Sequence, residues 1–210
     1  MLFILTGDIQ IGKTRWLQDL IARLTCDGVL CSGVIAPGDW VPDGEGGFEK
    51  LGINNTLLPQ GETIPFARRE DLAKVEGVYN ENSASARAQL VWHISDEAID
   101  QVNAHFATLA KGEGPQGAFG AFAGPELLVV DEFGRLELLR DEGLTEALAL
   151  VKAGTPSSPQ SATAPKHCLV IVRDYLLDQA HEKFTGAWGE TVVVSPNAEG
   201  EVAIRQALGV

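Results

Sequence analysis

The first residues whose types and spacing could do chemistry lie between positions 7 and 14. They read Gly-Asp-Ile-Gln-Ile-Gly-Lys-Thr and match G-x-x-x-x-G-K-[ST], the pattern of a phosphate-binding P-loop. An apolar run of strand type precedes them, and apolar residues at helical spacing follow. In such a strand–loop–helix unit, backbone N–H groups converge on phosphate at the helix N-terminus. This context favours a nucleotide-binding loop over a glycine-rich turn before an ordinary helix.

Each part of this loop has a predicted role. Gly7 and Gly12 let the backbone approach a phosphate closely. Lys13 is expected to carry its charge to the β- and γ-phosphates, and the Thr14 hydroxyl is expected to ligate Mg²⁺. The predicted nucleotide-binding residues are Gly7, Asp8, Ile9, Gln10, Ile11, Gly12, Lys13, Thr14 and Arg15.

A pair of acids follows an apolar run later in the chain. Leu127 to Val130 is wholly apolar and leads directly into Asp131 and Glu132, which is a Walker B pattern. Ligands of open parallel sheets bind at the carboxyl ends of the strands, so Asp131 is predicted to hold Mg²⁺ together with Thr14. Glu132 is predicted to orient or deprotonate the water that attacks the γ-phosphate. A solvated acid at a strand end is the alternative for Glu132.

Arg173 follows another apolar run, Cys168 to Val172, and is expected at the same edge of the sheet. We predict that it stabilises transition-state charge on the γ-phosphate, with a salt bridge to a nearby acid as the open alternative. Arg68 and Arg69 are lesser candidates, or a solvated pair. The histidines match no metal-ligand spacing and are expected to be structural or exposed; they are His93, His105, His167 and His181.

The surrounding elements predict an α/β fold. A chain of 210 residues suggests a single domain over residues 1–210. Apolar periodicity predicts a strand–helix–strand opening over 2–6, 13–26 and 29–36, which is the unit of parallel sheets. We therefore predict a mainly parallel sheet flanked by helices. Its further strands are expected at 90–94, 127–130, 168–172 and 191–194, and its further helices at 96–109, 142–153, 175–184 and 198–208.

An appended β-hairpin is predicted over residues 48–67. Residues 38–47, rich in Gly, Pro and Asp, are expected to form a loop before it. Within the hairpin we predict a strand over 48–53, a turn at Asn54-Asn55, a return over 56–59 and a short strand over 64–67. Residues 70–88 show no clear pattern.

Two further segments are predicted to be loops. Residues 111–125 contain Phe119 and Phe122, which either anchor this loop to the core or cover a ligand. Residues 154–166 are rich in Pro and Ser and are predicted to be flexible.

Composition narrows the functional classes. The net charge of −13, from 29 acidic and 16 basic residues, argues against binding along a nucleic-acid backbone. No apolar run approaches the roughly 18 residues of a membrane span, and the N-terminus does not fit a signal peptide, so we expect a cytoplasmic protein.

Cys26, Cys31 and Cys168 form no C-x-x-C pair and predict neither a metal site nor a disulfide framework. Cys26 and Cys168 are expected to be buried.

Three motifs resemble those of a known family. Residues 7–14, 32–37 and 131–138 look like the P-loop, the "GVI-P" strand end and the "DEIG-x-x-E" box of the small P-loop nucleoside-triphosphatases first described from thermophiles. The resemblance implies a RecA-like core and Mg²⁺-dependent hydrolysis of ATP, GTP and other triphosphates. It also implies the roles given above for Lys13, Thr14, Asp131 and Glu132. The departures from the family pattern, at Gln10, Ile11, Arg15 and Phe133, concern nucleotide preference and rate.

We therefore predict Mg²⁺-dependent hydrolysis of nucleoside triphosphates to diphosphate and phosphate. Lys13, Glu132 and Arg173 are the predicted catalytic residues. Two alternatives stay open: a nucleotide or small-molecule kinase, and a nucleotide-dependent adaptor in cofactor assembly. The sequence predicts neither the preferred base nor a protein partner.

Overall fold

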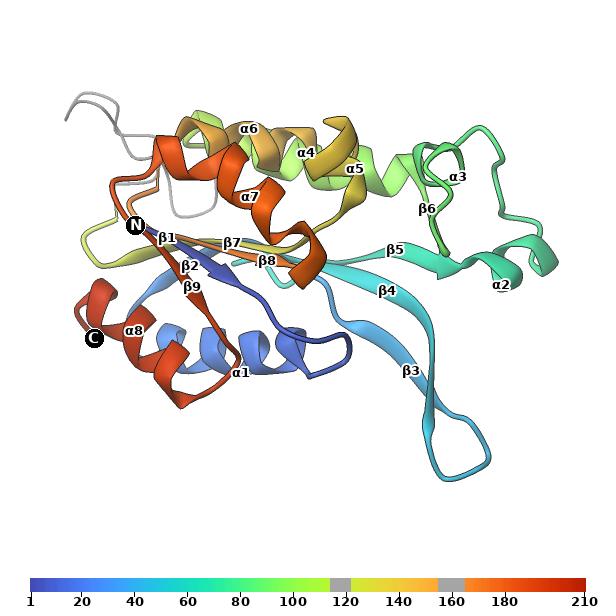
Figure 1. The fold of residues 1–210 in the computed structure, drawn as a ribbon, viewed down its shortest axis with the longest axis horizontal. Coiled ribbons are helices and arrows are strands. Elements are labelled where there is room, and N and C mark those ends of the chain that lie inside the picture. The colour runs from blue at the N-terminus through green and yellow to red at the C-terminus, as the bar shows by residue number, and fades with distance from the viewer. Residues whose placement is uncertain (114–121, 155–164) are drawn as a thin grey trace.

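The computed structural model describes residues 1–113, 122–154 and 165–210. In these residues, nine strands form one sheet (Figure 1). Its parallel part has the order β2-β7-β8-β1-β9. The bounds of these strands are β1 (Leu2–Leu5), β2 (Leu30–Ile35), β7 (Glu126–Phe133), β8 (Cys168–Val172) and β9 (Thr191–Val194).

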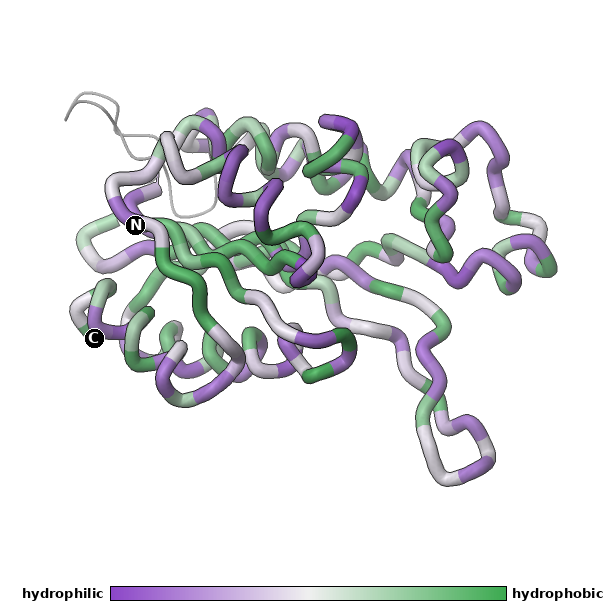
Figure 2. Tube along the Cα trace, viewed as in Figure 1, coloured by the Kyte–Doolittle hydropathy of each residue, from purple (hydrophilic) through white to green (hydrophobic). Residues whose placement is uncertain are grey.

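The strands of the parallel part are apolar because helices cover both faces of the sheet. Within β1, Leu2 and Ile4 contribute to one core and Phe3 to the other, as the twofold period of a strand requires. Figure 2 shows this concentration of apolar residues along the central strands.

The two helical layers differ in size (Figure 1). The helices α1 (Lys13–Cys26) and α8 (Ala198–Leu208) cover one face, while α4 (Asp96–Lys111), α6 (Thr145–Ala153) and α7 (Leu177–Phe184) pack on the other. Ser95 caps α4 by accepting from the Ala98 N–H, as first-turn acids after a serine predict. The remaining short elements are α2 (Glu70–Val75), α3 (Ala84–Arg87), α5 (Arg135–Arg140) and the 3₁₀ turns Asp174–Leu176 and Thr185–Ala187. No helix of the described residues is long and apolar enough to cross a bilayer.

An antiparallel extension continues the sheet beyond β2. It consists of β3 (Gly38–Pro42), β4 (Phe48–Leu58), β5 (Thr63–Arg69) and β6 (Trp92–Ile94), with β4 paired to β2, β3 and β5. The predicted hairpin therefore exists, as the β4–β5 pair. The end of β3–β4 projects away from the helical layers (Figure 1).

Several predicted boundaries in this extension are wrong. Residues 38–42 are not a loop but strand β3, and Asn54-Asn55 is not a turn, because β4 runs unbroken through Leu58. The 56–59 segment is consequently the end of β4 rather than a return strand. Asn54 and Asn55 pair with Pro65 and Ile64 of β5. Cross-strand pairing and burial thus override the weak strand propensity of asparagine.

The structure also corrects smaller expectations. Helix α5 lies in a segment for which no helix was predicted, and the helix expected from residue 142 begins at Thr145. Cys26 is exposed rather than buried, while Cys31 and Cys168 are buried. Phe119 and most of the 154–166 segment lie outside the described residues.

Candidate active site

The predicted phosphate loop joins the end of β1 to the start of α1. Gly7 and Gly12 have φ values of 144° and 96°, which only glycine adopts without strain. Gly12 is the N-cap of α1, and neither a side-chain cap nor an acidic residue occupies the first turn. The N-terminus of α1 therefore offers uncapped N–H groups and a favourable dipole to an anion.

Lys13 folds back over this loop. Its Nζ donates to the carbonyl oxygens of Gly7 (2.5 Å) and Asp8 (2.8 Å). Ile9 and Ile11 of the same loop are exposed, and Arg15 is exposed on the first turn of α1. The loop thus lies at the surface, with the Lys13 cation hydrogen-bonded to its backbone.

Thr14 and Asp131 meet at the carboxyl edge of the sheet. The Thr14 hydroxyl donates to Asp131 Oδ1 (3.3 Å), and the Ala36 N–H donates to Asp131 Oδ2 (2.8 Å). Only 4% of Asp131 is exposed, and this burial raises the pKa of its carboxyl to about 7. A hydroxyl and a carboxylate from two distant segments are thereby brought together as oxygen donors.

Glu132 occupies an unusual backbone conformation. Its φ is 78°, a left-handed value that is uncommon for residues other than glycine. The pairing of β7 with β8 is irregular between Val130 and Phe133, so Glu132 sits in a β-bulge, a device that re-aims a side chain. Strained residues of this kind cluster at functional sites.

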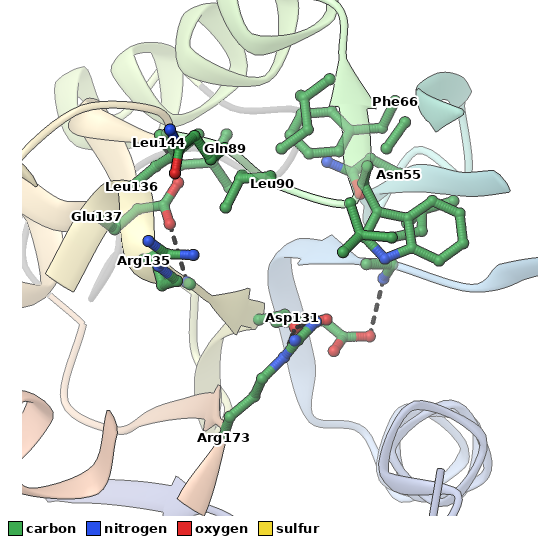
Figure 3. Close-up of a pocket in the computed structure, with 18 of the residues that line it drawn as sticks. Asn55, Phe66, Gln89, Leu90, Asp131, Arg135, Leu136, Glu137, Leu144 and Arg173 are labelled. Carbon is green, nitrogen blue, oxygen red and sulfur yellow. Dashed lines mark hydrogen bonds and ion pairs between the residues drawn. The ribbon is translucent and has the colours of Figure 1, made fainter. Parts of the chain in front are cut away.

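Arg173, at the end of the neighbouring strand β8, holds Glu132. Its Nε and Nη2 each lie 2.6 Å from Glu132 Oε1. The salt bridge kept open as an alternative for Arg173 therefore forms, and its partner is the candidate base. The side chain extends from β8 toward the Asp131 edge (Figure 3).

Lys50 was not predicted as a site residue. It extends from β4, with Nζ 5.3 Å from the ring centroid of Trp92 and 5.9 Å from that of Trp40. Burial lowers the pKa of Lys50, while the charges of Glu132 and Asp131 oppose that shift. The positive charge of Lys50 therefore interacts electrostatically with both acids. No motif marks a single lysine, so only the pairing of distant strands reveals it.

Asp174 is the second residue that sequence reasoning missed. Its Oδ1 accepts from the Thr6 hydroxyl and from the Gly7 N–H (2.7 Å), and the bond from Thr6 lowers the pKa of this carboxyl. Asp174 thereby ties the first residue of the phosphate loop to the end of β8. The feature of the sequence that could have identified Asp174 as a site residue is its position directly after Arg173.

The third acid of the box at 131–138 has a structural role. Glu137 is buried and accepts from the N–H groups of Gly134 (2.9 Å) and Leu144 (3.0 Å), so it caps α5. Burial raises the pKa of its carboxyl.

The lesser candidates lie in other networks. Arg68 pairs with Glu76 and Asp39, and Arg69 pairs with Asp71 and Glu49.

His93 and His105 are buried. In the described part of the chain, no group of three or more His, Cys, Asp and Glu side chains could hold a metal. A metal at Asp131 would therefore need ligands of other kinds, such as a hydroxyl, water molecules or phosphate oxygens.

Comparisons with known proteins identify the fold. No family model matches the chain, and no curated protein sequence matches it. The solution structure of a human cancer-related nucleoside triphosphatase matches with a TM-score of 0.57 and 16% identity, over 99% of this chain and 94% of that one. The chain therefore shares the fold of a nucleoside triphosphatase along nearly its whole length.

Proposed function

We propose that this protein hydrolyses nucleoside triphosphates to diphosphate and phosphate with the help of Mg²⁺. The observation that carries the proposal is the contact between Thr14 and Asp131. It joins the end of a glycine-rich anion-binding loop to a buried carboxylate on the adjacent sheet edge. Those two elements are what a P-loop enzyme needs for a nucleotide–metal complex.

The strand order supports the same proposal. Strand β1, which precedes the phosphate loop, lies between β8 and β9, and β7 with its acid pair lies next to β8. We assign this arrangement to a RecA-like P-loop core. The fold shared with a nucleoside triphosphatase agrees with that assignment.

The donor set fits Mg²⁺. This ion takes oxygen ligands, binds through one or two protein groups, and keeps waters and substrate phosphates as its other ligands. Thr14 and Asp131 supply such a hydroxyl and carboxylate. When bound, Mg²⁺ would neutralise charge on the β- and γ-phosphates.

The chain's own residues account for the remaining steps. Lys13 and the loop N–H groups bind the phosphates. Glu132 accepts a proton from a water molecule as the water oxygen bonds to the γ-phosphorus and the bond to the β–γ bridging oxygen breaks. Both contacts from Arg173 go to Glu132 Oε1, so Arg173 positions the carboxylate through that oxygen, and Oε2 is the proposed proton acceptor. Arg173 and Lys50 add positive charge at the site of developing negative charge.

A hydrolysis panel tests the proposal. Phosphate release is measured from ribo- and deoxyribonucleoside triphosphates and from diphosphates, with Mg²⁺ and with a chelator in its place. We expect release from triphosphates that needs Mg²⁺ and no added acceptor. Lys13→Ala should abolish both binding and turnover, while Lys111→Ala, at an exposed lysine ending α4, should change neither. Strict dependence on an added acceptor would instead indicate a kinase, and turnover that needs a protein partner would indicate an adaptor.

A further inference from the structure

A cavity of about 320 Å³ opens beside Asp131, Glu132 and Arg173 of the candidate site (Figure 3). It lies between the segment after β7 and the antiparallel strands β4, β5 and β6. Among the described residues, the phosphate loop contributes nothing to its lining. Its volume falls within the range of small-molecule sites, roughly 300 to 1,000 Å³. This cavity is therefore separate from the nucleotide loop and large enough for a small organic molecule.

Most of the cavity wall is apolar. Large apolar side chains in the lining include Ile53, Phe66, Leu90, Trp92, Leu136 and Leu144. They come from both sides of the space, and Figure 3 shows Leu136 and Leu144 on one side and Phe66 on the other. Such a surface favours a flat or compact apolar body over a sugar or a phosphate.

One polar group in this wall lacks a partner. Asn55 lines the cavity from β4 and is only 2% exposed. Its Oδ1 has no hydrogen-bond partner within the residues that the structure describes. A buried amide oxygen left unpaired is costly, and native proteins pair nearly all such groups. A ligand that donates an O–H or N–H bond would satisfy it.

The remaining wall is the candidate catalytic edge. Asp131, Glu132 and Arg173 all line the cavity. A molecule in it would therefore lie beside the Glu132–Arg173 pair rather than in an unrelated part of the protein.

We propose that this cavity binds a second, non-nucleotide ligand: a small, mainly apolar ring compound whose hydroxyl or N–H group donates to Asn55 Oδ1. The inference rests on the cavity and on Asn55, not on hydrolysis. Binding measured without nucleotide therefore tests it independently of the proposed function.

The probes are β-naphthol, a fused-ring alcohol, and its methyl ether, which has the same body but no donor. Each is titrated into the intact protein while the indole N–H signal of Trp92, assigned with Trp92→Phe, is followed by NMR. Asn55→Leu removes the acceptor at nearly constant volume. Asn54→Leu is the matched control, because Asn54 is the adjacent residue of β4 and does not line the cavity. Leu90→Trp fills the cavity from a partly exposed position.

We expect β-naphthol to bind the parent chain and Asn54→Leu alike, and to bind Asn55→Leu about five- to tenfold more weakly, the worth of one hydrogen bond. The methyl ether should bind the parent and Asn55→Leu equally. Leu90→Trp should remove binding of both probes. The proposal would be overturned if either Asn55→Leu or Leu90→Trp bound β-naphthol as tightly as the parent chain. It would also be overturned if β-naphthol did not move the Trp92 signal of the parent chain. Circular dichroism checks that each variant folds. If Asn55→Leu does not fold, the loss of binding in Leu90→Trp and the weaker binding of the methyl ether to the parent chain test the proposal.

Discussion

Arg173 holds one oxygen of Glu132 with two of its nitrogens, each 2.6 Å from Oε1. Glu132 lies near the end of β7 and Arg173 directly follows the neighbouring parallel strand β8, so the pair spans the edge of the sheet. Glu132 reaches this position through a backbone with a φ of 78°. Both the strained backbone and the fixed oxygen restrict the orientation of the carboxylate, which is the requirement for a positioned base.

Replacement of Glu132 by Gln should separate binding from turnover. The amide keeps the shape of the side chain but cannot accept a proton from water, so hydrolysis should fall by about 10² or more. Nucleotide affinity, measured with a fluorescent analogue, should be retained. Glu81→Gln, at an exposed position between α2 and α3, serves as the control. Unchanged hydrolysis in Glu132→Gln would refute the assignment of Glu132 as the base.

Asp131→Asn should raise the Mg²⁺ requirement. The change removes the negative charge of the proposed metal ligand while leaving an oxygen in place, so we expect the Mg²⁺ concentration for half-maximal phosphate release to rise about tenfold or more. A Mg²⁺ titration of phosphate release measures it. Asp100→Asn on the exposed side of α4 should leave the titration unchanged. An identical Mg²⁺ curve for Asp131→Asn would place the metal elsewhere.

Lys50→Met tests the lysine between two tryptophans. Methionine retains apolar packing against Trp40 and Trp92 but removes the charge that interacts with Asp131 and Glu132. We expect phosphate release to fall about tenfold, through lost stabilisation of transition-state charge, with little change in melting temperature. Lys74→Met is the matched control, because the Lys74 Nζ also lies over a ring, 4.8 Å from that of Tyr79. Equal activity of the two variants would exclude a role for the Lys50 charge.

Gly33→Ala should strongly destabilise the fold. A Cβ at this position would lie 2.0 Å from the Val129 carbonyl oxygen, and Gly33 has a φ of +121°. Overpacking and backbone strain each cost on the order of 1–3 kcal/mol, so the free energy of unfolding should fall by about 3 kcal/mol or more. Urea unfolding measures this loss. Gly189→Ala, where an added Cβ meets nothing within 4 Å, should have a small effect, and similar stability of the two variants would contradict the prediction.

His105 should make stability depend on pH. Its ring nitrogen Nε2 lies 3.1 Å from the Gly33 carbonyl oxygen, and burial lowers its pKa below the ordinary value of 6.5. The His105 side chain therefore binds a proton more tightly in the unfolded chain than in the folded chain. The contribution of His105 is complete above pH 6.5 and is lost as the pH falls through its lower folded pKa.

His105→Gln should remove this part of the pH dependence. Urea unfolding at about pH 7 and about pH 5 gives the loss of unfolding free energy on acidification, and the loss should be smaller in the variant than in the parent. His181→Gln on α7 is the control. An equal loss in His105→Gln and the parent would show that another group carries the dependence.

Local sequence determined much of the central fold. The strands β1, β7 and β8 are apolar at successive positions because both faces of the sheet are covered, and that pattern is visible without coordinates. The glycines at 7 and 12, the Ser95 cap and the acids near the end of β7 likewise follow from short-range chemistry. All of these depend on neighbours a few residues away, so the sequence alone was sufficient to predict them.

Tertiary structure alone decided how these parts meet. The charge of Lys50 interacts with the acid pair because β4 pairs beside β2, and Asn54-Asn55 stay extended because β5 pairs with them. The bulge at Glu132 and its bond to Arg173 depend on how β7 registers against β8. Each of these outcomes is the sum of packing and hydrogen bonds between segments far apart in the chain. The propensity of any one segment therefore cannot predict those contacts.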